Sequence, residues 1–447
     1  MKNVLIIAYY FPPTGGGGVQ RTLKFVKYLP AFGWIPTVLT VKNPDFDDFD
    51  ASLSDDIPPA TRIYRIGYFD PIRWYRTHRY GPHSRFEPMG QGIFADKKKP
   101  FHRFLLLPIK GLWNLFRRLL IDFVLIPDDL LFWIPVAVLK GIRVIKENKI
   151  DVVYATGPPW SSYVIAYFLG LITNKPYVLD MRDPWILSPY EADSHSIRRK
   201  LCCFWERKSF SSARYVINIT EDISNSYEKF YSKLSPNKFI TITQGFDPDD
   251  FLDIKIDRSD KFIISHIGTM YDIRTPENFL KAIKHLTDTA PEVKDNLKIR
   301  FIGITGSYTN DPMTRYKLQD IVDVIPYLPH RESIKNMKES SALLLIISKV
   351  QRSETQTPTG KLYEYLASRR PILGLVPAQN DAAKLIAKFD AGIITDPDDV
   401  QGIEDSVVRM YRSHKNGELR DHTGDISMFS RKELTKELAS ILDRASR

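Results

Sequence analysis

The chain has 447 residues, of which 43% are hydrophobic and 26% are charged, so its composition excludes a disordered or fibrous protein and its length predicts two domains. Its two cysteines, Cys202 and Cys203, are adjacent, which excludes a disulfide framework or a four-cysteine zinc site and favours a reducing compartment. The net charge is +10, and no apolar run is long enough to predict a signal peptide or a membrane-spanning helix.

The first half of the chain alternates short apolar segments with longer helical patterns, such as residues 20–29 and 161–169. Most of the short segments are continuous apolar runs, which is typical of parallel strands covered on both faces. The stretches between them supply helical crossovers. We therefore predict a doubly wound α/β domain with strands at Asn3–Tyr9, Thr37–Val41, Arg62–Ile66, Val152–Ala155, Tyr177–Met181, Tyr215–Ile219 and Phe239–Thr243.

Four consecutive glycines follow the first predicted strand and precede a predicted helix: Gly15, Gly16, Gly17 and Gly18. Glycine lets the backbone approach a ligand closely, and the amides at a helix start favour an anion. The spacing differs from that of a dinucleotide-binding loop, and no acidic residue ends the next strand. A flexible connection is the alternative, but the place at the end of a strand favours ligand contact.

The positive charge is concentrated in residues 60–118, which hold thirteen Lys and Arg against three Asp and Glu. Cations, aromatic residues and an apolar helical run interleave there, as in an interfacial membrane element. A core helix with a solvated basic face is the alternative, and no nucleic-acid module accompanies the segment. Anionic lipid attracts each cation by about 1 kcal/mol. We therefore expect membrane or acceptor contact through Lys97, Lys98, Lys99, Arg103, Trp113, Arg117 and Arg118.

Gly, Pro and Asp cluster at residues 245–250, as a hinge or turn requires, so we place the domain boundary after residue 245. The first domain, residues 1–245, carries the basic aromatic insertion near residues 60–140. The second domain, residues 246–430, repeats the α/β pattern, and residues 431–447 form a final helix. Its predicted strands are Phe262–Ile267, Lys298–Ile302, Val322–Tyr327, Leu343–Ile347, Ile372–Leu375 and Gly392–Thr395.

Two segments of the second half carry groups suited to an anion. Gly268 ends a strand with Arg274 six residues later, which suits a diphosphate, although glycine after a strand is also routine turn chemistry. Gly360 starts a predicted helix with Lys361 at its beginning, which reinforces anion binding by the first amides. Glu364 lies one turn in, where it either accepts hydrogen bonds from sugar hydroxyls or merely favours the helix N-terminus.

Seven motifs, taken together and in this order, resemble the GT-B glycosyltransferases, in particular the large retaining family 4. The resemblance covers nearly the whole chain, and each motif alone is modestly specific. The motifs are residues 9–18, 151–159, 178–185, 244–247, 267–271, 327–330 and 360–367.

This resemblance implies two Rossmann-like domains that face a cleft, with the final helix crossing back to the first domain. It also implies that the second domain holds a nucleotide-diphosphate sugar, with the ribose on Glu364, the diphosphate near Gly360 and Lys361, and the base near residues 327–330. The glycine loop approaches from the first domain. The expected donor-binding residues are Gly15, Gly16, Gly17, Gly18, Gly268, Thr269, Arg274, His330, Thr357, Gly360, Lys361 and Glu364.

Three positions depart from the family pattern. Gln356 stands where a second glutamate is usual, eight residues before Glu364. Thr269 stands where an arginine usually follows the glycine. Arg182 and Asp183 stand where the family commonly has a His-Asp pair, and an arginine binds phosphate well but is no mild proton relay. We expect these two residues and Gln356 to be the catalytic ones.

The chemistry implied is sugar transfer with retention of configuration, in which dipoles and cations of the second domain stabilise the departing diphosphate. Asp183 is expected to orient or deprotonate the acceptor hydroxyl. The alternative is a structural ion pair with Arg182 or a turn contact before Pro184. The aspartate pairs at 128–129 and 249–250 lack the context of a metal motif, so we expect no metal and no cofactor besides the donor.

The predicted function is a glycosyltransferase on the cytoplasmic, inner face of a membrane, acting on a lipid-linked or cell-surface glycan precursor and not on nucleic acid. A nucleotide-sugar epimerase of the same fold is one rival, and it would need acid/base carboxylates. A non-catalytic scaffold that binds membrane or glycan is the other, and Gln356 and Thr269 motivate it.

Overall fold

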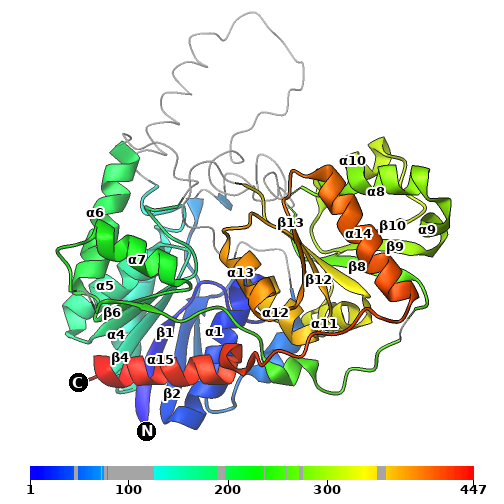
Figure 1. The fold of residues 1–447 in the computed structure, drawn as a ribbon. Helices are drawn as coiled ribbons and strands as arrows, with labels where there is room; N and C mark the ends of the chain where they lie inside the picture. Colours follow the sequence, from blue (N-terminus) through cyan, green and yellow to red (C-terminus); the bar gives the residue numbers. More distant parts are fainter. Residues whose placement is uncertain are drawn as a thin grey trace, which may run out of the picture.

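The computed structural model describes residues 1–44, 49–71, 73–74, 78, 125–188, 197–235, 237–257, 259–270, 275–349 and 359–447. Within these residues the apolar segments form two separate parallel sheets, each with helices on both faces (Figure 1). The predicted fold class, an α/β protein with two doubly wound domains, is therefore confirmed.

The first sheet has seven parallel strands in the order β3-β2-β1-β4-β5-β6-β7. The chain moves outward in one direction from β1 and in the other from β4, so a crevice opens at the carboxyl ends of these two strands. All the predicted strands are present, with ends that shift by a few residues. They are β1 Lys2–Ile7, β2 Trp34–Val41, β3 Arg62–Ile66, β4 Val152–Gly157, β5 Tyr177–Met181, β6 Tyr215–Asn218 and β7 Phe239–Thr241.

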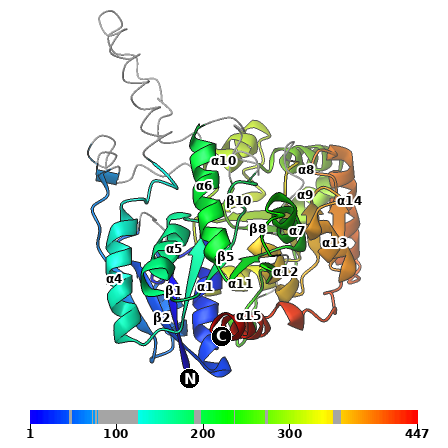
Figure 2. The same ribbon diagram turned by 90° about the vertical axis from the view of Figure 1, so that its left-hand side faces the viewer.

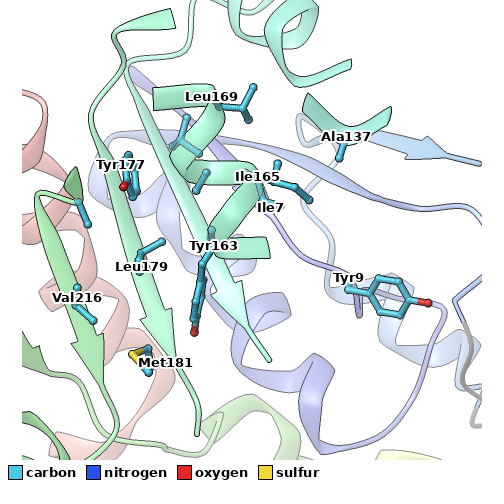
Figure 3. Packing of buried hydrophobic residues seen from close by; sticks show 14 of the residues in the cluster. Ile7, Tyr9, Ala137, Tyr163, Ile165, Leu169, Tyr177, Leu179, Met181 and Val216 are labelled. Atoms are coloured by element: carbon cyan, nitrogen blue, oxygen red, sulfur yellow. The ribbon is translucent and has the colours of Figure 1, made fainter. Parts of the chain in front are cut away.

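One face of this sheet is covered by α4, α5, α6 and α7, and the first three of these helices lie side by side (Figure 2). The other face is covered by α1 and the last helix of the chain. Figure 3 shows part of the first of these interfaces, where Ile165 and Leu169 of α5 pack with Leu179 of β5, all fully buried. The helices are α1 Gly17–Tyr28, α4 Trp133–Glu147, α5 Ser161–Thr173, α6 Ile197–Ser212 and α7 Glu221–Phe230.

The second sheet repeats this plan with the strand order β10-β9-β8-β11-β12-β13, so its crevice lies between β8 and β11. Its strands are β8 Phe262–Ile267, β9 Leu297–Ile302, β10 Val322–Ile325, β11 Ala342–Ile346, β12 Ile372–Leu375 and β13 Gly392–Thr395. Its helices are α8 Glu277–Thr289, α9 Pro291–Asn296, α10 Gly306–Arg315, α11 His330–Glu339, α12 Gly360–Ser368, α13 Asp381–Lys388 and α14 Val400–Lys415.

The chain passes between the two sheets twice, and the two passages run side by side. The Phe246 amide donates to the Phe429 carbonyl at 3.1 Å, and the Arg431 amide donates to the Phe246 carbonyl at 2.7 Å. A side chain at Gly245 would overlap the Phe429 carbonyl, so this close approach needs glycine. The last helix, α15 Arg431–Ala445, then packs on the first domain, where Leu434 and Leu442 are buried against β1 and α1.

None of the helices in the described part of the chain is both long and apolar enough to cross a bilayer.

Candidate functional site

The glycine loop connects β1 to α1 at the crevice of the first sheet. Gly16 precedes the first residue of α1 and has φ 84°, a conformation that glycine adopts without strain. Gly17 is exposed, and open space surrounds the position that a side chain there would take. The twelve-residue helix α1 therefore begins within the glycine loop, as the sequence predicts, and its first residue is exposed.

Arg182 holds the glycine loop to the loop that follows β4. Its guanidinium donates to the carbonyls of Gly18, Gly157 and Pro158, and the side chain is buried. These bonds to main-chain oxygens favour a role in positioning the two loops. A contact between Arg182 and a phosphate remains a prediction. Asp183 follows directly and is exposed at the carboxyl end of β5.

Gly268 and Lys361 come together at the crevice of the second sheet. Gly268 has φ 133°, and the Lys361 side chain crosses directly over it, where any Cβ would stand. The Lys361 ammonium lies 3.3 Å from Nε2 of His266 and 3.5 Å from the Thr269 carbonyl. The sequence predicted donor-binding residues in two separate segments, around Gly268 and around Lys361, and the fold brings Gly268, Thr269 and Lys361 together; their binding of a donor remains a prediction.

Glu364 lies in α12, which begins at Gly360 after the cap residue Thr359. The first turn of α12 holds no acidic residue, and the carboxylate of Glu364 makes no hydrogen bond with another described residue. Burial raises the pKa of Glu364, while the nearby charges of His330 and Arg431 oppose that rise. The carboxylate therefore does not cap the helix, and its oxygen atoms can accept hydrogen bonds from a ligand.

Arg431 extends this environment from the start of α15. Its side chain is buried, one guanidinium nitrogen donates to Gln244 at 3.1 Å, and the other terminal nitrogen has no hydrogen-bond partner among the described residues. Burial and the neighbouring Arg21 lower the pKa of Arg431 to about 10, while Glu364 counteracts them. The guanidinium of Arg431 thus interacts electrostatically with the Glu364 carboxylate.

Tyr327 and His330 touch the first domain. The Gly16 amide donates to the Tyr327 hydroxyl at 3.3 Å, and the His330 amide donates to the Asp50 carboxylate at 2.9 Å. The His330 ring lies 3.0 Å from Asp250. Burial alone would lower the pKa of His330, but the bond to Asp250 raises it. These residues join the glycine loop to the second domain.

Three carboxylates, of Asp56, Asp247 and Asp250, converge beside this contact. The ammonium of Lys24 lies among them, at 2.5, 2.8 and 2.6 Å respectively. The other predicted aspartate pair is also engaged, because Asp128 is buried and accepts from the Ser161 and Leu130 amides. In both places the carboxylates serve contacts between elements of the fold.

Some predicted residues lie outside the described part of the chain. These are Arg274, Gln356 and Thr357 of the donor and catalytic sets, and Lys97, Lys98, Lys99, Arg103, Trp113, Arg117 and Arg118 of the basic segment. Their roles stay predictions.

The sequence reasoning missed four residues of this region: His266, Arg431, Asp50 and Lys24. His266 could have been recognised in the sequence, because it is the one ionisable residue of a strand that is otherwise almost entirely apolar. Arg431 could also have been recognised, as a cation at the first position of a helix, where the macrodipole disfavours it. Asp50 and Lys24 look like ordinary surface residues in the sequence.

Two doubly wound domains whose crevices meet, with a last helix that packs on the first domain, define the GT-B fold. No family profile matches the chain, and no curated protein matches its sequence. Solved structures do match it over their full length. Sucrose-phosphate synthase from Thermosynechococcus elongatus has a TM-score of 0.59 at 12% identity, covering 100% of this chain and 96% of that one.

Two further neighbours are similar to the same extent. HepE from Anabaena, solved in complex with UDP, has a TM-score of 0.56 at 13% identity and covers 100% of this chain and 97% of its own. TarM from S. aureus, solved with fondaparinux, α-GlcNAc-glycerol and UDP, has a TM-score of 0.59 at 9% identity, covering 99% and 100%. At these identities the likeness is one of fold, which is the fold that the sequence motifs predict.

Proposed function

We propose that the protein is a glycosyltransferase that moves a sugar from a nucleotide-diphosphate donor to an acceptor hydroxyl, with retention of configuration and without a metal. The observation that carries this proposal is the arrangement at α12. One helix start presents backbone amides, the Lys361 ammonium and, one turn further, the Glu364 carboxylate at the crevice of the second sheet. A nucleoside diphosphate suits this arrangement, because its diphosphate needs an anion-binding group and its ribose hydroxyls need a hydrogen-bond acceptor about one helical turn away.

In this proposal each part of the site has one task. Glu364 accepts hydrogen bonds from the ribose hydroxyls, and the α12 amides with Lys361 bind the diphosphate. As the bond between the anomeric carbon and the diphosphate breaks, these groups stabilise the negative charge that develops on the leaving oxygen. The acceptor oxygen forms the new bond on the same face, and its proton passes to the departing diphosphate. Asp183, exposed across the crevice, orients the acceptor hydroxyl.

The solved neighbours support the class of donor. HepE and TarM were both solved in complex with UDP, and a third neighbour is a synthase of a sugar phosphate. A uridine nucleotide is therefore the first donor class to test, and guanosine and adenosine nucleotides follow.

Thermal unfolding with UDP, GDP and ADP tests the donor site, because only a ligand that binds the folded state raises its stability. We expect one diphosphate to raise Tm, and Glu364→Gln to weaken its affinity at least tenfold. Glu332→Gln, an exposed glutamate on α11, is the matched control and keeps the affinity. Undiminished affinity in Glu364→Gln would contradict the assignment of Glu364 to the donor site.

Incubation with nucleotide sugars separates the proposal from its rivals. Slow release of free sugar from one donor is the result expected of a transferase without its acceptor. Inversion at C2 of the sugar would instead identify an epimerase, and neither binding nor turnover would leave a non-catalytic scaffold.

We further propose that the enzyme docks on the anionic inner face of a membrane, where a lipid-linked acceptor would be presented. The exposed positions of α6 support this proposal. Phe204 and Ile197 are about half exposed, and the cations Lys200, Arg207 and Lys208 are exposed beside them, whereas the only acidic residue of α6 is buried. Aromatic residues with flanking cations suit an anionic lipid surface.

Two neighbouring features enlarge this surface. Leu171 and Ile172 at the end of α5 are exposed at 67% and 56%, and α5 lies beside α6 (Figure 2). Arg198, in the first turn of α6, donates to the Leu125 carbonyl at 2.9 Å, so α6 begins beside a residue that follows the basic segment in the sequence.

Co-sedimentation with vesicles that contain anionic lipid tests this docking. We expect binding to fall several-fold when Lys97, Lys98, Lys99, Arg117 and Arg118 are replaced with Gln, and again with Phe204→Ser. Leu252→Ser, which changes a similarly exposed apolar residue of the second domain, is the control. Equal binding of all variants contradicts membrane docking without touching the donor site.

A further inference from the structure

His266 occupies a position inside the second sheet from which it reaches the candidate donor site. It is the fifth residue of β8, and its side chain is buried. Its Nδ1 lies 2.9 Å from the Leu344 carbonyl of β11, and its Nε2 lies 3.3 Å from the Lys361 ammonium. The ring thus spans the gap between the neighbouring strand and the first turn of α12.

The two contacts determine the protonation of the ring. A carbonyl oxygen only accepts, so Nδ1 must carry the proton and donate it to Leu344. An ammonium only donates, so Nε2 must be unprotonated and accept from Lys361. The neutral imidazole is therefore anchored at one nitrogen and offers its lone pair to the lysine at the other.

His266 gives the Lys361 ammonium a fixed acceptor. A lysine ammonium is a point charge on a four-carbon stem with many rotamers, and this stem lies across Gly268, which offers no side chain to confine it. The arginine that usually follows the glycine in the family resembled is Thr269 here. With one cation fewer beside Gly268, the placement of Lys361 at the α12 start matters more for binding the charge of a diphosphate.

We propose that His266 is a positioning residue that holds the Lys361 ammonium at the diphosphate subsite. This inference rests on the proposed function, because it assigns that subsite to a nucleoside diphosphate. His266 itself does not touch the ligand. It restricts the Lys361 side chain before the ligand binds, so less conformational entropy is lost on binding.

Two amide substitutions separate this role from a structural one. The amide of His266→Asn reaches the position of Nδ1, so it keeps the bond to Leu344 and loses the contact with Lys361. The amide of His266→Gln reaches the position of Nε2, so it keeps an acceptor for Lys361 and leaves the Leu344 carbonyl unpaired. His266→Asn is therefore expected to be the more stable variant, and His266→Gln is expected to bind the diphosphate more tightly.

Isothermal titration with the diphosphate among UDP, GDP and ADP that binds the wild-type chain best, and with its nucleoside, measures the effect. We expect His266→Asn to weaken the diphosphate about tenfold and His266→Gln about threefold or less, with the nucleoside affinity unchanged in both. Thermal unfolding of the same samples shows that each variant is folded. In a Lys361→Ala background, His266→Asn should cause no further loss, because the partner that it positions is gone.

Three results would overturn the proposal. They are equal losses in the Asn and Gln variants, a loss that extends to the nucleoside, and a loss that persists in the Lys361→Ala background. Failure of the wild-type chain to bind any of the three diphosphates would refute the proposed function and this inference with it. Binding by the wild type without the Asn/Gln difference would refute this inference alone.

Discussion

At the scale of single residues, two independent constraints act on Gly268. Its φ of 133° lies where residues with a side chain are strained, and the Lys361 stem lies in the space that a Cβ would need. We predict that Gly268→Ala displaces Lys361 and weakens a nucleoside diphosphate at least tenfold, in addition to a loss of stability of about 1–3 kcal/mol from backbone strain. Titration calorimetry and thermal unfolding measure the two effects.

Gly417 supplies the control for backbone strain. It has φ 71° at the end of α14, with open space around the position of a side chain. Gly417→Ala should therefore lower stability while it leaves diphosphate affinity unchanged. If Gly268→Ala keeps its affinity as Gly417→Ala does, Lys361 does not contact the diphosphate.

The residues that sequence reasoning found and missed differ in one physical respect. Gly268, Lys361 and Glu364 were found because each carries its signal locally, as a glycine after a strand or a charge in the first turns of a helix. His266 acts through a lysine 95 positions away, and Lys24 through an aspartate 226 positions away. A single sequence contains no information on such pairs, because the fold alone brings them together.

At the scale of elements, a buried carboxylate ties α6 to α7 and to the turn after β5. Glu206 of α6 accepts hydrogen bonds from the Ile186 amide at 3.0 Å and from the hydroxyls of Tyr227 and Tyr231 at 3.2 and 2.8 Å. It is fully buried, and this burial raises its pKa to about 7 despite the three donors. The turn that carries Asp183 is therefore held by a group that titrates near neutral pH.

This pKa predicts how stability changes with pH. Between the usual value of 4.5 and about 7 the folded state keeps the Glu206 proton while the unfolded state loses it, so stability falls as pH rises through that window. Because each pKa unit corresponds to 1.36 kcal/mol, the loss attributable to Glu206 is about 3 kcal/mol. Glu206→Gln has no such loss, so its stability relative to the wild type should rise by about that amount.

Denaturant unfolding at pH 5, 6, 7 and 8 measures the difference. Glu418→Gln, at an exposed position after α14, is the matched control and should follow the wild type at every pH. Parallel curves for the wild type and Glu206→Gln would show that Glu206 is ionised throughout and that the prediction is wrong.

The elements themselves were largely predictable, because parallel strands covered on both faces must be continuous apolar runs. Strands such as Arg62–Ile66, Tyr177–Met181 and Phe262–Ile267 occur with the predicted ends. The predicted end of Val322–Tyr327 was wrong, since β10 stops at Ile325 and Tyr327 turns toward Gly16. An apolar residue near the end of such a run either belongs to the strand or follows it and packs on another domain. The sequence alone does not distinguish these two possibilities.

At the scale of the whole molecule, polar contacts join the two domains on the side of the glycine loop. Lys24 and Lys27 of α1 pair with aspartates of the 3-10 turn Pro248–Phe251 and the residue before it, and His330 of α11 bonds both Asp50 and Asp250. Nearly all of these contacts are charged, whereas most of the side chains that α15 buries against the first domain are apolar.

His330 is the histidine of this contact, and its protonation controls the charge on its bond to Asp250. Its pKa is raised, and the pKa of Asp250 is lowered to about 2 because the bond to His330 and the charge of Lys24 outweigh burial. Glu364 and Lys24 also face the His330 ring. The charged bond is therefore fully present below pH 6.5 and is lost as pH rises through the raised pKa of His330, while Asp250 stays ionised.

We predict that this loss loosens the interface between the domains. Hydrogen exchange of segments 14–20 and 325–333 in the wild type should be about fivefold slower than in His330→Gln at pH 6, because a charge-assisted bond is stronger than the neutral one by about 1 kcal/mol. Above the raised pKa of His330, which the pH dependence of its ring signals in NMR spectra locates, the two proteins should exchange alike. His285→Gln removes a histidine–carboxylate bond of 2.6 Å within the second domain and should change neither segment. Equal exchange of the wild type and His330→Gln at pH 6 would mean that the charge on His330 does not hold the domains together.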